Sequence, residues 1–321
     1  MTHDLNHQIT CIDTQHLRPN AVAAYLIQDG NYAAFVDTGC HLSVPILLQT
    51  LKDKGVRREN ILYILTTHIH LDHAGGLGEL IKYLPNATAY VHERGARHMI
   101  DPTKLKDSVL AVYGETFFKQ TLGDLIPTPA DRIKIPKDGE SIKLGNRELT
   151  FIDTPGHARH HYCIWDEQSK GIFSGDTLGA SYREFDTDKG ELIFPPTTPV
   201  QFDPDAWHNT IDKLLTLHGE FAYLTHFSRI PFNAKNAKKL KDGIDNFAKI
   251  ALKHKNYTGR SDAIKNSLGS YLLNNAAEHG VTINQAQQMA LFEDDLSICA
   301  QGLETWLETI HIARSFSGLY K

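Results

Sequence analysis

The chain has 321 residues, 41% hydrophobic and 22% charged, which is an ordinary composition for a globular protein. This length suits one large α/β domain with an appendage, or two modest domains. The formal net charge of −5 gives no basic face of the kind that nucleic-acid binding usually needs, so we expect no nucleic-acid partner. The one basic run, 235–241, is better explained as the solvated face of a helix.

Membrane and secretory signals are absent from the sequence pattern. No apolar run approaches the ~20 residues that cross a bilayer, and the first residues lack the charged and then apolar pattern of a signal peptide. The four cysteines, Cys11, Cys40, Cys163 and Cys299, form no Cys-x-x-Cys pair, as expected for free thiols in a reducing compartment. We therefore expect a cytoplasmic protein that acts on a small molecule without a membrane, with a homodimer left open.

Strands and helices alternate over the first part of the chain. Two apolar runs, 21–27 and 33–36, flank a turn at Asp29-Gly30-Asn31 and predict a hairpin. The next predicted elements are a helix from Ser43 to Lys54 that ends at Gly55, a buried strand over 61–65, a short helix over 77–83 and a strand over 88–91.

The middle and the end of the chain differ in character. Residues 93–132 have loosely helical spacing and predict a helical insertion, either a lid over a site or ordinary core. Strand patterns then resume at 141–144, 148–152, 162–165, 171–174 and 221–224. Helical periodicity dominates from about 231. We therefore predict an α/β domain over 1–230, with two similar halves and the site between them, and a C-terminal helical region over 231–321.

The one unusual number in the composition is 18 histidines, and several of them are clustered. His68, His70, Asp72 and His73 lie within six residues, directly after the predicted strand 61–65. A loop can turn all four side chains towards one pocket, whereas a strand or helix would scatter them. Imidazole and carboxylate are the expected ligands of a borderline metal such as zinc, and they are costly to bury without one.

Three more residues have the position that a site requires. His157, Asp176 and His226 each follow an apolar strand, which is where loops build sites at the edge of a sheet. Taken alone, each of them would more often be a surface or capping residue. Their joint placement favours a shared site.

In this order and spacing, the seven residues resemble the ligand set of the metallo-β-lactamase-fold superfamily, over residues 21–230. The resemblance implies a four-layer αββα sandwich with a dinuclear site at one edge of its two sheets. It assigns His68, His70 and His157 to a first metal, Asp72, His73 and His226 to a second, and Asp176 to a bridge between them. Zinc is the default for the two divalent ions, with manganese or iron as alternatives.

Two such metals, ~3.5–4 Å apart, would share a water and lower its pKa towards neutrality. The resulting hydroxide would attack an electrophilic carbonyl or phosphorus. Asp72 could orient this nucleophile and pass its proton onward.

Two features of the sequence, Asp176 and the turn at His157, favour one group of enzymes within the superfamily. Asp176 argues against an antibiotic-degrading β-lactamase, because those enzymes generally lack the bridging carboxylate. The turn ending at His157, followed by His161, is similar to that of glyoxalase-II-like thioesterases and lactonases, although Arg159 and His160 replace the usual Pro-Gly. We predict a hydrolase of an ester-like bond: thioester, lactone or carboxylic ester. The alternatives are a phosphodiesterase or nuclease on the same site, and a non-catalytic binding protein that retains the fold.

Other residues have less certain roles. Tyr182 could donate to a substrate oxygen, as a tyrosine after the bridging aspartate does in lactonases, or it could simply be packed. Asp37 could lie behind the metal ligands or form a turn. His161 could support a ligand or lie on the surface, and the stiff segment 195–199 could wall the pocket or only connect. The C-terminal helices could shape a thiol-substrate site, as in glyoxalase-II-like enzymes, another pocket or a dimer interface.

Overall fold

The computed structural model describes residues 1–317, and the chain divides into two compact units. The last four residues of the predicted C-terminal helical region lie outside the described part. Unit 1 comprises Met1–Thr154, His160–Gly175 and His218–Phe232. Unit 2 comprises Pro155–Arg159, Asp176–Leu217 and the chain from Asn233 onward. The predicted division near residue 230 stays a prediction.

Unit 1 contains a first sheet with the order β1-β2-β3-β4-β5-β6-β7, antiparallel from β1 to β4 and parallel from β4 to β7. The predicted hairpin is confirmed as β3 and β4. The strands β1 and β2 were not predicted, because the polar N-terminal sequence has no clear period-2 pattern. The strands are Thr2–Leu5, Ile9–Asp13, Ala23–Asp29, Tyr32–Val36, Ile61–Leu65, Thr88–Tyr90 and Ile133–Lys134.

The second sheet of unit 1 has the order β13-β12-β11-β10-β9-β8. Its strands pair antiparallel except for β11 and β12, which run parallel. The strand β13 was not predicted, because Ser-Arg-Ile-Pro carries little strand signal. From β8 to β13 the strands are Ser141–Leu144, Arg147–Asp153, Tyr162–Asp166, Gly171–Gly175, Phe221–Leu224 and Ser228–Pro231.

Buried aromatic rings fill the space between the two sheets. Tyr25 of β3 meets Phe173 of β11 at a centroid distance of 5.3 Å, and Phe173 stacks on Tyr223 of β12 at 4.6 Å. Further along, Tyr90 of β6 stacks on Phe151 of β9 at 5.2 Å. These contacts bury large apolar areas at favourable ring geometries, so they hold the two sheets face to face.

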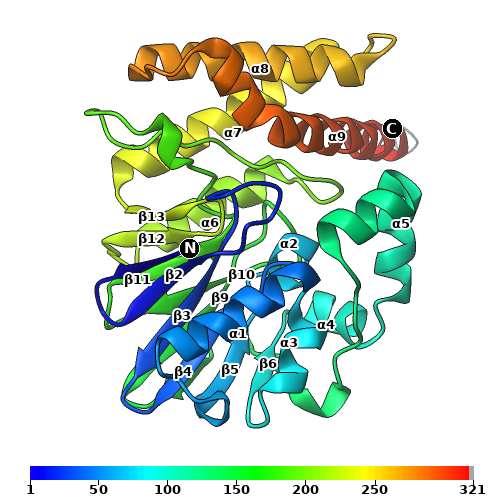
Figure 1. Ribbon diagram of the computed structural model, residues 1–321. Helices are drawn as coiled ribbons and strands as arrows, with labels where there is room; N and C mark the ends of the chain where they lie inside the picture. The colour runs from blue at the N-terminus through cyan, green and yellow to red at the C-terminus, as the bar shows by residue number, and fades with distance from the viewer. Residues whose placement is uncertain (318–321) are drawn as a thin grey trace. The chain divides into compact units, whose positions relative to one another are not determined.

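Helices cover the outer face of the first sheet in unit 1 (Figure 1). They are α1 (Val44–Asp53), α2 (Leu71–Ala74), α3 (Leu77–Leu80) and α4 (Glu93–Ile100). The helix α5 (Thr103–Phe117) lies beside them and packs on a small cluster of Leu71, Phe118 and Leu125. Leu47 and Leu51 of α1 join Phe35 and Ile64 of the sheet in one buried cluster. Ser43 is the N-cap residue of α1 as predicted, but its hydroxyl donates to the Thr14 carbonyl instead of capping the helix.

Unit 2 contains α6 (Pro204–Leu215), α7 (Ala234–His254), α8 (Arg260–His279) and α9 (Gln285–Ser317). The side chains of Asp203 and Asn233 cap α6 and α7 by accepting backbone N–H groups. The helix α6 was not predicted. Across residues 1–317, no helix combines the length and apolar character needed to cross a bilayer.

One buried ion pair in unit 1 joins both sheets. Arg147 of β9 donates to Asp166 of β10 at 3.0 Å, and neither side chain is exposed. The same guanidinium also donates to the carbonyl of Gln28 in β3 at 3.2 Å and to that of His7, in the turn between β1 and β2, at 2.7 Å. Loss of the carboxylate would leave a buried cation without its counter-charge.

We therefore expect Asp166→Ala to lower the free energy of unfolding by roughly 3–5 kcal/mol, as measured by urea denaturation. Glu59→Ala is the control, because the Glu59 side chain is exposed and pairs with Arg57 at 3.9 Å, and it should stay within about 0.5 kcal/mol of the wild type. An Asp166→Ala midpoint equal to that of the control would show that the buried pair is not needed.

Candidate metal centre

The histidine-rich segment leaves β5 and passes directly into α2. His68 and His70 lie in the connecting loop, but Asp72 and His73 lie in the short helix α2, so the prediction of a loop throughout is wrong there. The turn after α2 is tightly packed. A Cβ at Gly75 would lie 2.3 Å from the Leu71 carbonyl oxygen, so only glycine fits.

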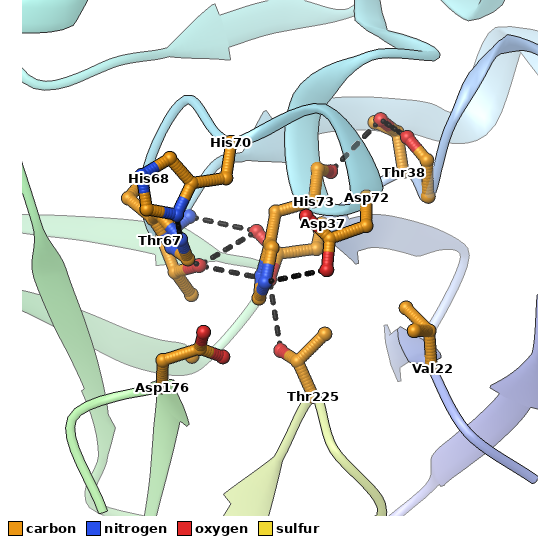
Figure 2. A network of polar contacts seen from close by, with 12 residues as sticks. Val22, Asp37, Thr38, Thr67, His68, His70, Asp72, His73, Asp176 and Thr225 are labelled. Carbon is orange, nitrogen blue, oxygen red and sulfur yellow. Dashed lines mark hydrogen bonds and ion pairs between the residues drawn. The ribbon is translucent and has the colours of Figure 1, made fainter. Parts of the chain in front are cut away.

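The Asp37 carboxylate holds this segment from behind (Figure 2). Asp37 follows β4 with a φ of 55° and is 1% exposed. It accepts hydrogen bonds from the backbone and hydroxyl of Thr67 at 2.8 Å each, from His73 Nδ1 at 3.0 Å and from the Thr225 hydroxyl at 3.0 Å. Asp37 thus lies behind the predicted ligands, as one of the two sequence interpretations stated.

Asp72, His73 and His226 form one group in unit 1 whose ligand atoms all lie within 4.8 Å of one another. Asp72 Oδ2 lies 3.4 Å from His73 Nε2 and 3.3 Å from His226 Nε2. A carboxylate and a carbonyl oxygen only accept, so the Nδ1–H groups of the two rings donate to Asp37 and to the Ala21 carbonyl. In the neutral rings, the two Nε2 atoms then carry lone pairs beside Asp72.

The charge state of Asp72 fits this group. Burial alone would raise the pKa of the Asp72 carboxyl, but His73 and His226, when their rings are also protonated at Nε2, outweigh burial through charge and hydrogen bonds and hold that pKa well below its usual range. Asp72 is therefore an anion at neutral pH. One carboxylate and two imidazole nitrogens form a donor set that suits a divalent cation such as zinc.

His68 and His70 approach each other in the same unit, with His68 Nε2 2.8 Å from His70 Nδ1. His161 is fully buried behind them, with its ring stacked on His68 at 4.8 Å and its Nδ1 2.8 Å from the Thr154 hydroxyl. Burial holds the pKa of His161 well below its usual range and lowers that of His160 to about 4. His161 therefore supports His68 and does not lie on the surface.

Unit 2 carries the two remaining predicted ligands. His157 and Asp176 are both buried, and His157 Nε2 lies 3.4 Å from Asp176 Oδ2. His157 Nδ1 donates to the Pro196 carbonyl at 2.7 Å, and the Thr198 hydroxyl lies 3.3 Å from Nε2. The stiff segment 195–199 therefore contacts a predicted ligand directly.

Tyr182 is 3% exposed, and its hydroxyl donates to the Asp295 carboxylate of α9 at 2.9 Å. The proton that the sequence interpretation assigned to a substrate oxygen is thus already shared with a carboxylate. A role for Tyr182 in binding substrate stays a prediction, and it would require this hydrogen bond to rearrange.

The sequence reasoning missed several partners of the predicted residues. Thr67 and Thr225 each stand directly before a predicted ligand, so their positions in the chain were an available signal. Asp295 lies 113 residues after Tyr182 and had no such signal. Within unit 1, five predicted ligands gather as two groups, and within unit 2 the other two form a pair.

Asp37→Asn tests the network behind the ligands. The new amide NH₂ would face a buried donor at either oxygen position, whether the Thr67 N–H or the His73 Nδ1–H. We expect the free energy of unfolding to fall by about 1–3 kcal/mol, as measured by urea denaturation of metal-free protein. Asp53→Asn is the control, because Asp53 accepts only from exposed Gln49. Equal stability of the two variants would contradict the role given to Asp37.

Comparison with known proteins identifies the family. A family model described as the metallo-beta-lactamase superfamily matches residues 17–226. An acyl-coenzyme A thioesterase of Bos taurus, MBLAC2, is 29% identical in an alignment 182 residues long, and the match covers 50% of this chain and 59% of that protein. A probable hydroxyacylglutathione hydrolase of Schizosaccharomyces pombe is 28% identical over 162 residues, 48% of each chain. The chain thus spans 59% of the length of the first relative and 48% of the second.

A solved structure shows how far the likeness extends in three dimensions. The metallo-beta-lactamase family protein TTHA1429 from Thermus thermophilus superposes with a TM-score of 0.67 at 19% identity, over 95% of this chain and 94% of that one. This likeness confirms the predicted fold, with two mixed sheets, surrounding helices and further C-terminal helices. The family match covers more than half of the sequence and includes all seven predicted ligands. The chain belongs to the metallo-beta-lactamase superfamily.

Proposed function

We propose that this chain is a dinuclear metal-dependent hydrolase of ester-like bonds. The observation that carries the proposal is the group Asp72, His73 and His226, whose ligand atoms lie within 4.8 Å of one another. Each imidazole in it has its Nδ1–H bound to an oxygen behind it, which fixes the ring and presents Nε2 as a ligand atom. An anionic carboxylate beside two such nitrogens fits a divalent cation.

The second metal would use the other four predicted ligands. We propose that His68 and His70 of unit 1 act together with His157 of unit 2, and that Asp176 bridges the two ions. The superfamily resemblance supports this assignment, as do the buried positions of His68, His157 and Asp176. His157 supports it further, because its Nδ1 donates to a carbonyl and its Nε2 is the atom nearest Asp176. We take zinc as the default, with manganese or iron as alternatives.

When bound, the two cations supply a water of lowered pKa and polarise the substrate oxygen that gains charge. The residues of the chain position and assist this chemistry. Asp72 is ionised at neutral pH, and the carboxylate oxygen that does not hold a cation could accept a proton. Asp37 keeps the His73 ring in place through Nδ1, so that Nε2 stays available.

A thioester is the first choice of substrate, followed by lactones and carboxylic esters. The names of two relatives, an acyl-coenzyme A thioesterase and a probable hydroxyacylglutathione hydrolase, both support thioester chemistry. The net charge of −5 supports a small-molecule substrate over nucleic acid. A phosphodiesterase and a non-catalytic protein are the other outcomes that the experiments below distinguish.

Metal content is the first test. Purified protein incubated with zinc, manganese or iron(II) and then desalted should retain close to two ions per chain by elemental analysis. His73→Ala should lower that number by about one, because it removes a ligand from one group only. Retention of essentially no metal by the wild type under all three conditions would refute the proposal.

Activity is the second test, on a panel of acyl-coenzyme A and glutathione thioesters, lactones, aryl esters and bis-aryl phosphodiesters. Asp72→Ala should lower kcat/KM by at least about 10²-fold, because it removes a ligand and the proposed proton acceptor. Asp131→Ala, at an exposed position outside the site, should leave the rate unchanged. Turnover of phosphodiesters alone would move the assignment to the alternative class, and no turnover by metal-loaded protein would favour a binding protein.

A further inference from the structure

A short segment of unit 2, residues 195–198, lies between His157 and the C-terminal helix α9. The Pro196 carbonyl accepts the His157 Nδ1–H at 2.7 Å, and this bond determines which ring nitrogen is left to bind a metal. Thr197 is fully buried and faces the other way, towards α9. Whatever holds this segment in place therefore also holds the ring of His157.

Cys299 of α9 binds the segment through three polar contacts. Its Sγ accepts the Thr197 N–H at 3.3 Å, its carbonyl accepts the Thr197 hydroxyl at 3.4 Å, and its thiol donates to the Pro195 carbonyl at 3.8 Å. Burial raises the pKa of this thiol to about 12, so it keeps the proton that it donates. Cys299 is 2% exposed and serves as a fixed anchor for the backbone of the segment.

Gly302 lets the segment approach α9 closely. A Cβ at Gly302 would lie 2.0 Å from the Thr197 carbonyl oxygen and 2.7 Å from the Thr198 carbonyl carbon. Both are backbone atoms, so a side chain at this position must displace the segment. A second glycine, Gly243 of α7, faces the Pro195 ring, where an added Cβ would lie 2.9 Å from Cδ. Two helices thus leave space for the same four residues.

We propose that Cys299 and Gly302 of α9 are positioning residues for the metal ligand His157. They act through the segment 195–198, whose Pro196 carbonyl orients the imidazole ring. The C-terminal helix is therefore part of the support of the metal centre and is not only an appendage. This inference rests on the proposed function, because it takes His157 to be a ligand.

The substitution Gly302→Ala separates two effects, because helix propensity and displacement of the segment 195–198 predict opposite results. Alanine favours a helix more than glycine does, so Gly302→Ala would stabilise α9 if only helix propensity counted. If the added Cβ displaces the segment 195–198, Gly302→Ala should instead disturb the His157 ring and weaken metal binding. Partners that orient a ligating histidine typically change metal affinity by about 10–100-fold when they are lost.

The experiment uses the full-length chain with ¹⁵N-labelled histidine, studied by NMR without metal and by zinc competition against a chromophoric chelator. The His157 Nδ1–H signal is assigned by its loss in His157→Gln. Gly302→Ala is compared with Gly269→Ala on α8, where an added Cβ would meet side-chain atoms, of Met289 at 3.3 Å and of Leu296 at 3.5 Å, and no backbone of another segment within that distance. A second pair, Cys299→Ala and Cys299→Ser, removes the sulfur and then restores an acceptor for the Thr197 N–H.

We expect Gly302→Ala and Cys299→Ala to shift or lose the His157 signal and to weaken binding of one zinc ion by about 10-fold or more. Gly269→Ala should match the wild type, and Cys299→Ser should recover most of the signal. Wild-type signal and affinity in both Gly302→Ala and Cys299→Ala would overturn the inference. If Gly302→Ala does not fold, the Cys299 pair decides alone. A wild type that binds no zinc would refute the proposed function, while the metal-free NMR signal still tests the positioning.

Discussion

The buried carboxylate of Asp37 is the constraint on which the candidate site depends. A carboxylate away from water is costly unless its oxygens are fully paired. Asp37 obtains that pairing from Thr67 after β5 of the first sheet, His73 in α2 and Thr225 after β12 of the second sheet. The same hydrogen bonds therefore satisfy the anion, join the two sheet edges and set the ring of a predicted ligand. One buried carboxylate thus contributes both to the stability of unit 1 and to the geometry of the site.

The parts of the fold that the sequence predicted well are those with strong periodic patterns or unusual residue types. The runs 21–27 and 61–65 are nearly all apolar and became buried strands. The histidine cluster could be interpreted because buried imidazoles need partners, and the spacing of its residues resembled a known family. In each case a local signal and a general energetic cost pointed to the same structure.

The parts that could not be predicted depend on contacts between distant residues. The strand β2 is fully buried and pairs with both β1 and β3, which its own five residues do not reveal. The Tyr182 hydroxyl was assigned a substrate, and its partner proved to be Asp295 on a helix 113 residues away. The placement of Asp72 and His73 in a one-turn helix likewise reflects the close packing around Gly75, which residue type alone does not specify.

The division of the chain into two units limits where the chain can be truncated. The strands β11 and β12 pair in unit 1, yet most of the residues between them, 176–217, belong to unit 2. In unit 2, Phe185 stacks on Phe292 of α9 at 4.4 Å with ring planes 3° apart. A shortened chain that stopped after β13 would retain Phe185 and lose the ring that covers it. Truncation there would expose apolar surface, so the C-terminal helices must be kept in the same chain as the segment 176–217.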